Sequence, residues 1–490
     1  MNETPDKLPM LAAIPPPEQI AAPPPILEPP HDGVALRSVV GVKLSVVMFL
    51  THFSVGAWIV TLGAYIEANT GLAGARLFSA GFIGVAYGAG PLGGMIAPFL
   101  TGLLADQYFA TERIMAVLHV AAAGALWLAV IAESQAAFYV AMIAYFVCFI
   151  PSFSLMASMT LHHLARPERD FPLVRACSTT GWVAAGIFVG WFWPTFAGTK
   201  IEATAVPMQI GVVGELVTAL FCLCLPHTPP TNRRSAKPAG GFSGSQTLDL
   251  VRQPRFLVLI ALAALAHIPS QFYYAYGNVY LNRWVKWDAV AAKMTLGQVV
   301  EVACMIILPA VLLRTSVKTA IMVGLAAWSV RYGILAAAAS PELPGRDPLI
   351  YGAILLHGIA FTLVTISLQL DVDRCAGRRR RATAQGLLAV AMSGVGCFLG
   401  AQLAGVAGAA WLPADLATAT VAGWRTFWLL PAGWQGPFWD WFCCFCRAID
   451  RPEGLGPSKS GPISGLSRTV FTSSSGGAQS PGHFSRIQIW

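Results

Sequence analysis

Charged side chains are scarce in this chain. Aspartate, glutamate, lysine and arginine make up 11% of its 490 residues, whereas about 25% is usual for a soluble globular domain. A protein of this size with so few charges cannot cover a surface that faces water on all sides. Hydrophobic residues instead make up 55% of the sequence, and they recur in runs of about 20, long enough to cross a lipid bilayer as a helix. The composition therefore excludes a soluble protein and predicts an all-α membrane protein.

The sequence also lacks the patterns of several other protein classes. Its apolar runs are continuous, which excludes the alternating strands of a membrane β-barrel. The motifs HExxH and GxSxG do not occur, and His162 and His163 are adjacent rather than spaced as metal ligands. The string GAGPLG (88–93) lies inside an apolar run with no strand before it, so it predicts close helix packing rather than a dinucleotide site. We therefore expect no enzyme activity, no metal and no cofactor.

The net charge of +8 lies mostly in short loops between apolar runs. This pattern differs from the basic, aromatic-interleaved stripe of a nucleic-acid-binding surface, so we expect no nucleic-acid partner. It matches the excess of Lys and Arg in the cytoplasmic loops of proteins embedded in a lipid bilayer. With the N-terminus inside, basic loops alternate with poorer ones, which predicts cytoplasmic termini in the plasma (inner) membrane.

Twelve transmembrane helices are predicted, six on each side of a basic linker. They cover residues 39–66, 75–105, 112–132, 136–163, 172–195 and 203–226, and then 254–283, 288–313, 317–340, 347–370, 382–410 and 421–447. Two six-helix halves are typical of a transporter built from repeats, with the substrate site near the midplane between them. We call residues 39–226 the first half, an N-terminal six-helix bundle, and residues 250–447 the second half, a C-terminal six-helix bundle.

The remaining segments are predicted to lie outside the membrane. Residues 1–38 form a proline-rich tail that we expect to be disordered, residues 227–249 a cytoplasmic linker, and residues 448–490 a low-complexity tail rich in Gly and Ser. The composition changes abruptly after residue 433, so the last span is expected to be short or poorly packed.

A few polar residues lie inside the apolar spans, where a carboxylate costs roughly 2.5–3.5 kcal/mol. Arg175, Thr179 and Trp182 are spaced to share one helix face. A guanidinium, a hydroxyl and an aromatic plane on one face suit a flat, polar ligand. Gln298 and Glu301 share a face of another helix. The alternative for Arg175 is an anchor at the end of a helix.

Glu301 has a structural alternative too, which is a buried ion pair. Arg331 is a candidate for its partner, or else extends to the membrane surface. A substrate role for Arg331 is the less favoured interpretation.

The string GLLADQYFATER (102–113) places Asp106 in a tight loop between the second and third spans. There it can accept hydrogen bonds from a helix N-terminus and pair with a nearby arginine; a solvated loop acid is the alternative. The segment resembles the Gly-x-Leu-Ala-Asp loop of the major facilitator superfamily. The resemblance implies the twelve-helix fold of that superfamily, with Gly102, Asp106 and Arg113 in a conformational loop.

From about residue 44 to residue 433 the chain resembles the nucleoside:proton symporters of that superfamily. The strings that carry the resemblance occur in the family's order: TLGAYI, GLLAD, DFPLVR, LPHTPP, YGNVYL, GQVVE and RATAQG. The substrate-binding positions that it implies are Arg175, Thr179, Trp182, Gln271, Gln298, Glu301 and Phe361. It also implies hydrogen bonds to the ribose and base and stacking on the base; for Phe361, plain packing is the alternative.

Two positions depart from this family. Tyr274 stands where some members have a binding asparagine, and Thr362 stands where some have an aspartate beside the aromatic residue. A threonine cannot take a proton near neutral pH, which puts proton coupling in doubt and leaves Glu301 as the obvious titratable group for it.

The resulting hypothesis is a monomeric permease that moves a uridine-like nucleoside together with protons by alternating access. One rival is a permease of the same fold for a sugar or another small polar solute. A second rival, from a different class, is a membrane receptor or scaffold that binds its ligand without moving it.

Overall fold

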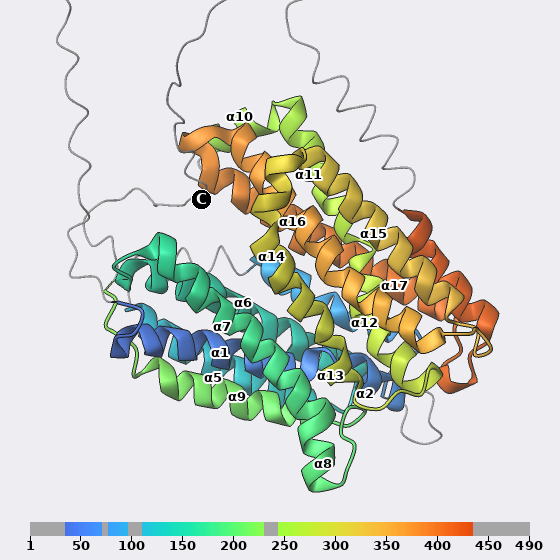
Figure 1. The fold of residues 1–490 in the computed structure, drawn as a ribbon. Helices are drawn as coiled ribbons and strands as arrows, with labels where there is room; N and C mark the ends of the chain where they lie inside the picture. The colour runs from blue at the N-terminus through green and yellow to red at the C-terminus, as the bar shows by residue number, and fades with distance from the viewer. Residues whose placement is uncertain (1–34, 71–76, 97–109, 230–243, 435–490) are drawn as a thin grey trace, which may run out of the picture.

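The computed structural model describes residues 35–70, 77–96, 110–229 and 244–434 (Figure 1). Within these ranges the chain is nearly all helical, with one isolated β-bridge between Thr70 and Phe78. Gly102 and Asp106 lie outside the described residues, as do the two tails and most of the linker. Arg113 is exposed near the start of α5 (Thr111–Val130). The role of these three residues as a conformational loop therefore stays a prediction.

The first half consists of helices that follow the predicted spans. Besides α5 they are α1 (Val39–Ile59), α2 (Leu62–Ala68), α3 (Phe82–Tyr87), α6 (Gln135–His163), α7 (Pro167–Ile187), η1 (Phe188–Phe192), α8 (Trp193–Ala197) and α9 (Val206–Cys222). Serine side chains begin two of them: Ser38 accepts a hydrogen bond from the Gly41 N–H at 3.1 Å, and Ser134 accepts one from the Ala137 N–H at 3.2 Å. Each serine satisfies a backbone donor that the start of a helix leaves free.

The second half also consists of helices in the part that the structure describes. Its elements are α10 (Gly244–Val251), α11 (Pro254–His267), α12 (Ser270–Val279), η2 (Tyr280–Trp284), α13 (Val290–Met294), α14 (Leu296–Arg314), α15 (Val317–Ala337), α16 (Arg346–Ala389), η3 (Val390–Gly396), α17 (Cys397–Trp411), η4 (Leu416–Thr418) and a further helix at residues 421–434. Pro254 opens α11, where its missing N–H removes no helical hydrogen bond.

The helix α16 is 44 residues long, although the sequence predicts two spans here with a basic loop between them. The Gln385 side-chain Nε2 donates a hydrogen bond to the Gln369 carbonyl oxygen at 2.8 Å. In a straight helix these two residues would lie about 24 Å apart. The chain therefore reverses direction between them, and the two predicted spans are antiparallel neighbours.

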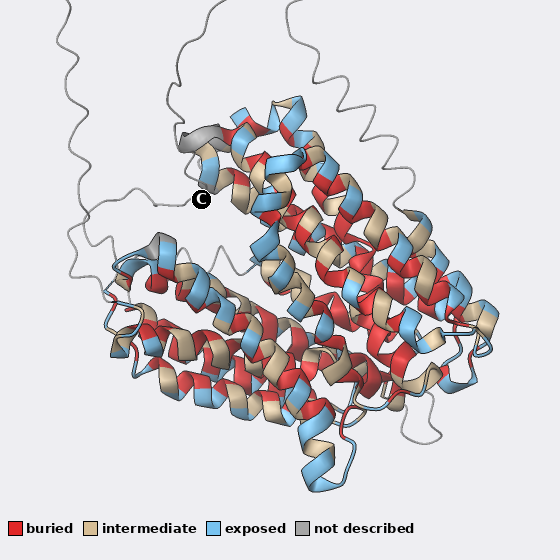
Figure 2. Cartoon of the chain, viewed as in Figure 1, coloured by how far each residue is buried: buried red, intermediate tan, exposed pale blue. Residues whose placement is uncertain are grey.

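Nine helical segments of the described chain are long and apolar enough to cross a membrane. Shorter apolar helices at Phe82–Ile96 and Val206–Cys222, and the helix at residues 421–434, occupy the predicted second, sixth and twelfth spans. Many residues on the outer faces of the helices are exposed (Figure 2), among them the apolar Val117, Ile306 and Leu313. Such outward apolar side chains are expected where a protein faces lipid tails.

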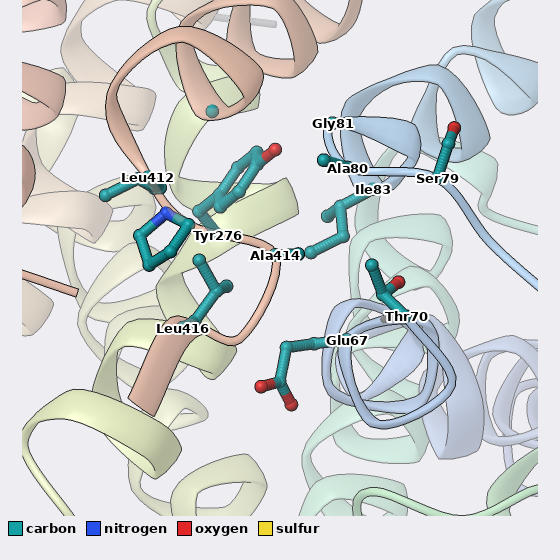
Figure 3. A pocket seen from close by; sticks show the side chains of 12 residues that line it. Glu67, Thr70, Ser79, Ala80, Gly81, Ile83, Tyr276, Leu412, Ala414 and Leu416 are labelled. Carbon is teal, nitrogen blue, oxygen red and sulfur yellow. The ribbon is translucent and has the colours of Figure 1, made fainter. Parts of the chain in front are cut away.

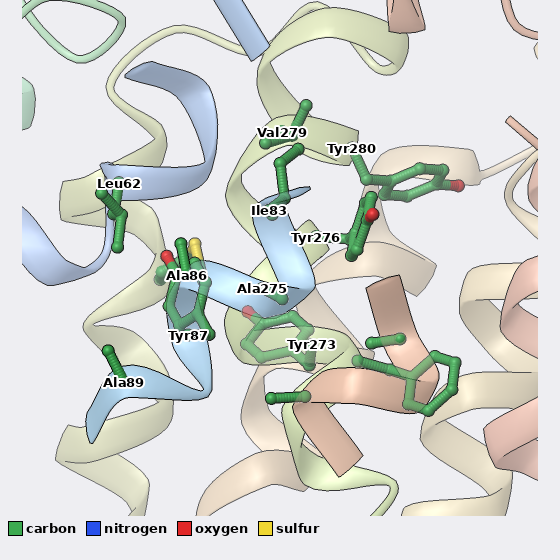
Figure 4. Close-up of a cluster of buried hydrophobic side chains, with 14 of the residues drawn as sticks. Leu62, Ile83, Ala86, Tyr87, Ala89, Tyr273, Ala275, Tyr276, Val279 and Tyr280 are labelled. Carbon is green, nitrogen blue, oxygen red and sulfur yellow. The ribbon is translucent and has the colours of Figure 1, made fainter. Parts of the chain in front are cut away.

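The two halves pack against each other at one end of the molecule, through α2 and α3 on one side and α12 and α17 on the other (Figure 4). Glycine permits the close approach. A Cβ atom on Gly84 would lie 2.4 Å from the Ala401 carbonyl oxygen, and one on Gly63 would lie 2.6 Å from the Ala275 carbonyl oxygen. Small residues at such crossings allow backbones to meet inside a membrane. Figure 1 shows α10 and α11 of the second half diverging from α6 and α7 of the first half toward the other end.

Candidate functional site

A cavity of about 230 Å³ lies between the two halves. The first half lines it with Ile59, Val60, Tyr87, Gly90, Pro91, Phe146 and Trp182, and the second half with Gln271, Tyr273, Tyr274, Ala291, Met294, Thr295 and Gln298. Most of these side chains are apolar or aromatic, and a few are polar, which is typical of a small-molecule site. Because both halves contribute, a rotation of one half against the other would change access to the cavity.

Three of the predicted binding residues line this cavity. They are Trp182 of α7, Gln271 of α12 and Gln298 of α14. The side-chain oxygen Oε1 of Gln298 is buried and has no hydrogen-bond partner among the described atoms. An unsatisfied buried oxygen costs roughly 1–3 kcal/mol, so a donor on a bound molecule would stabilise it.

The predicted residues Arg175 and Thr179 lie on α7 together with Trp182. Val174 and Ser178 face α1 and are buried, and the Ser178 hydroxyl lies 3.3 Å from the sulfur atom of Met48. Arg175 is left exposed and Thr179 partly exposed. Neither residue lines the 230 Å³ cavity.

Glu301 is half-buried on α14 and lies outside the lining of the cavity. It interacts electrostatically with Arg175 of the first half, and no hydrogen bond or ion pair joins these two described residues. A Cβ atom on Gly358 would lie 2.3 Å from the Glu301 backbone nitrogen, which shows how closely α16 approaches α14 here. The Thr362 hydroxyl donates a hydrogen bond to the Glu301 carbonyl oxygen at 3.4 Å.

Phe361, the last of the predicted residues, also lies outside the cavity lining. Its ring centroid is 5.8 Å from that of His357 and 6.5 Å from that of His267. Phe361 thus packs near two buried imidazole rings of the second half.

Sequence reasoning missed most of the aromatic lining. It did not single out Tyr87 and Phe146 of the first half or Tyr273 of the second. It noted Tyr274 as a departure from the family at a binding position but did not count it among the binding residues. Its spacing indicated a lining role, because Tyr274 follows Gln271 by three positions and so lies on the same helix face.

The GAGPLG string packs helices closely. A Cβ atom on Gly88 would lie 2.5 Å from the Gln402 Nε2 of the second half, and one on Gly93 would lie 2.5 Å from the Phe146 Cβ. Within the string, Gly90 and Pro91 form part of the cavity wall.

Arg331 differs from both sequence interpretations. It is fully buried on α15, so it does not extend to the membrane surface. Its guanidinium carbon lies 3.6 Å above the centroid of the Tyr273 ring, and its Nη1 lies 3.1 Å from the Nδ1 of His357. Arg331 therefore contacts an aromatic ring and an imidazole, and it forms no ion pair with Glu301.

The first half contains a buried polar cluster that the sequence analysis did not single out. Glu215 on α9 accepts a hydrogen bond from the Tyr145 hydroxyl at 2.9 Å, and its other oxygen lies 2.6 Å from the His119 Nδ1. The side chains of Glu215 and His119 are completely buried. The cluster links α5, α6 and α9 and does not line the cavity. It accounts for a carboxylate inside the sixth span.

Polar contacts join the two halves at the end where they pack together, which we call the closed end. Glu202, in the loop before α9, accepts a hydrogen bond from the Ala291 N–H at 2.8 Å and one from Asn282 at 3.2 Å. Lys200 pairs with Asp288 on the surface. Burial raises the pKa of the Glu202 carboxyl, whereas the Lys200 ammonium lowers the pKa of Asp288.

A further ion pair crosses the closed end. Glu67 of α2 lies 2.6 Å from the Arg283 Nε of η2, and the Glu67 side chain is 4% exposed. Both halves also line a small cavity of about 20 Å³ here, with Glu67 and Gly81 on one side and Tyr276 and Leu412 on the other (Figure 3). The closed end is therefore held by buried polar contacts as well as by apolar packing.

Comparison with known proteins places this arrangement in a family. Residues 39–447 match the family model described as "Nucleoside H+ symporter". YegT of Escherichia coli (strain K12), provisionally named a nucleoside transporter, is 32% identical over 367 residues, which cover 74% of this chain and 83% of YegT. Xanthosine permease of the same organism is 26% identical over 408 residues, which cover 81% of this chain and 93% of the permease.

The fold is also similar to a solved structure. The crystal structure of the nucleoside transporter NupG matches with a TM-score of 0.73 and 22% sequence identity, over 84% of this chain and 100% of NupG. At that identity the similarity shows the fold alone. It confirms the predicted all-α arrangement of two six-helix halves.

Proposed function

The chain belongs to the nucleoside H⁺ symporter family, and on that premise we propose that its central cavity carries a nucleoside across the membrane together with a proton. The observation that supports this most directly is the cavity itself, which both halves line with aromatic rings and two glutamine side chains. A nucleoside has a flat base and a polyhydroxyl ribose. Aromatic rings can stack on the base. Glutamine amides can form hydrogen bonds with hydroxyl and carbonyl groups as donors or as acceptors.

In this proposal Trp182 packs on the base while Gln271 and Gln298 form hydrogen bonds to the ligand. The unpartnered Oε1 of Gln298 supports its part, since a ribose hydroxyl or an N–H of the base would satisfy it. Arg175, Thr179, Glu301 and Phe361 come into contact with the ligand as the halves close around it. Arg175 and Thr179 lie on α7 and Glu301 lies on α14, and these two helices contact each other between the halves. Movement of α7 against α14 would therefore bring the three side chains toward the cavity.

We assign proton coupling to Glu301. Its carboxylate attracts the Arg175 guanidinium of the other half, so a proton on the carboxyl would weaken this attraction and free the guanidinium for the ligand. Thr362 cannot replace it, because a hydroxyl does not ionise near neutral pH.

Uptake of radiolabelled uridine by cells that lack their own nucleoside transporters tests this function. Concentrative uptake that an uncoupler abolishes would support it, and competition by nucleosides but not by free ribose or other sugars would exclude the sugar permease. Binding of uridine in detergent without uptake into vesicles would indicate a receptor instead.

The proton-coupling role of Glu301 is tested by Glu301→Gln. This variant should abolish uphill uptake and spare counterflow, which needs exchange but no driving force. Uncoupler-sensitive uphill uptake by this variant would place the proton elsewhere.

A second variant tests the ligand role of Arg175. Arg175→Lys keeps a positive charge but loses the planar fork that donates several hydrogen bonds at once. Stabilisation of the purified protein by uridine in a thermal-shift assay should shrink or vanish. Unchanged affinity would make Arg175 a helix anchor.

We further propose that the closed end faces outward and that both termini are cytoplasmic. The loops at the opposite end carry most of the positive charge, which favours the cytoplasm. Single cysteines at the exposed positions Arg252 and Lys200 should label from opposite sides of the membrane. Labelling of both from the outside would refute this orientation.

A further inference from the structure

Arg331 is a buried cation whose partner is unusual. Its side chain is fully buried, yet it contacts the ring of Tyr273 and the imidazole of His357 and is found in no ion pair with a described carboxylate. Its Nε and Nη2 atoms have no hydrogen-bond partner among the described atoms. The guanidinium is within hydrogen-bond distance of His357. This contact determines which nitrogen of the histidine carries a proton.

An arginine donates hydrogen bonds and accepts none. The His357 Nδ1, 3.1 Å from the Arg331 Nη1, must therefore present its lone pair and carry no proton. A neutral imidazole then carries its proton on Nε2. A second positive charge on this ring would face a buried guanidinium directly, which disfavours the imidazolium. His357 is thus held as the neutral Nε2–H tautomer.

The proton on His357 Nε2 points to a cavity residue. The Nε2 atom lies 3.5 Å from the hydroxyl oxygen of Tyr274, so the imidazole donates and the hydroxyl accepts. Tyr274 is only partly buried and lines the cavity. Since the oxygen of its hydroxyl accepts from the histidine, the hydroxyl hydrogen remains free to donate toward the cavity.

We propose that Arg331 and His357 are positioning residues that hold Tyr274 as a hydrogen-bond donor to the transported molecule. This inference rests on the proposed nucleoside function and deepens it. The ligand must place a hydrogen-bond acceptor against Tyr274: a carbonyl oxygen or an unprotonated ring nitrogen of the base. A molecule with an N–H at that point would meet another donor and would be disfavoured.

Competition for uridine uptake by matched analogues tests this relay. The panel pairs uridine with the riboside of pyrimidin-2-one, which lacks the C4 carbonyl oxygen and the N3 hydrogen, and adenosine with its 1-deaza, 3-deaza and 7-deaza analogues, each lacking one ring nitrogen. In the wild type one of these losses should raise the half-inhibitory concentration about three- to tenfold, the range of a single neutral hydrogen bond. We call the half-inhibitory concentration of an analogue divided by that of its parent nucleoside the analogue ratio. In Tyr274→Phe, which keeps the ring and removes the hydroxyl, the analogue ratio should fall to about one.

Two substitutions of His357 separate positioning from packing. His357→Gln can still accept from Arg331 and donate to Tyr274, so it should retain the analogue ratio. His357→Leu does neither and should lose it. Thermal unfolding in detergent monitors folding, and if the leucine variant does not fold, the glutamine variant and Tyr274→Phe decide the question.

An analogue ratio in Tyr274→Phe equal to that of the wild type would overturn the relay while leaving nucleoside transport established. So would a folded His357→Leu variant with an unchanged ratio. A wild type that takes up no nucleoside would instead overturn the proposed function and the relay with it.

Discussion

The two ends of the molecule are held together in different ways. At the closed end, ion pairs and hydrogen bonds cross between the halves: Glu67 with Arg283, Lys200 with Asp288, and Glu202 with Asn282. At the opposite end the pairs Arg255–Asp371 and Arg381–Asp373 stay within the second half, and Glu112 of the first half pairs with His227 at the start of the linker. None of these three pairs joins the two halves. Contacts within a half keep that half rigid, whereas contacts between halves oppose their separation. The difference indicates that opening the closed end requires breaking a small, specific set of polar contacts.

The largest effect is expected from Glu67→Ala. Removing one partner of a buried ion pair costs about 3–5 kcal/mol, and the partial exposure of Arg283 (35%) brings the expected cost to the lower end of that range. The open form should gain about a hundredfold in relative population. A cysteine at Thr295, which lines the cavity, should then react much faster with a membrane-impermeant maleimide added outside, in a background free of native cysteines.

Asp371→Ala is the matched control for Glu67→Ala. It also removes the acid of an ion pair with a partly exposed arginine, but this pair lies within the second half. External labelling at Thr295 should not rise in this variant. An equal rise in both variants would show that loss of stability, and not opening of the closed end, causes the labelling.

Glu202→Ala should have the next largest effect. It removes the acceptor of two hydrogen bonds, from the Ala291 N–H and from Asn282. At about 1 kcal/mol for each bond, the open form should gain roughly tenfold or more. The same maleimide assay measures this gain, and a labelling rate like that of the wild type would mean that Glu202 does not hold the halves together.

Acidification should make the closed end more stable, to a smaller degree. Burial raises the pKa of Glu202 above its ordinary value of 4.5 when the end is closed, and exposure on opening would return it toward that value. The closed form therefore binds the proton more tightly and gains population as the pH falls through the raised pKa toward 4.5. Below that range both forms are protonated and the gain ends. A maleimide reacts with the thiolate, so the labelling rate at each pH is divided by that of a free thiol. The corrected external labelling should slow as the pH is lowered from neutral toward 4.5, and Glu202→Gln should remove this corrected dependence.

Lys200→Ala should have the smallest effect of the four. Its pair with Asp288 lies on the surface, with both side chains about three-quarters exposed. Exposed pairs contribute little and are screened by salt. The labelling rate should rise less than in Glu202→Ala, and the rise should shrink further in high salt. A rise as large as that of Glu202→Ala would make the surface pair a principal lock of the closed end.

The amino-acid sequence by itself determined the membrane class, the positions of the spans and the two halves. Apolar runs and basic loops carry this information locally, because each helix must satisfy its own backbone in lipid. The sequence also placed Trp182, Gln271 and Gln298 among the binding candidates, and the structure finds them around one cavity. The turn inside α16 followed from the same local signal, since its basic residues interrupt the apolar run.

Only the tertiary structure decided which side chains from distant spans meet. Glu202 and Asn282 are 80 positions apart, and Arg331 and His357 are 26 apart on separate helices. No periodicity within one helix encodes such pairs, because they depend on how helices rotate and cross once packed. For the same reason the sequence analysis proposed Glu301 as a partner for Arg331. In the structure Arg331 packs on the ring of Tyr273 and contacts His357 instead.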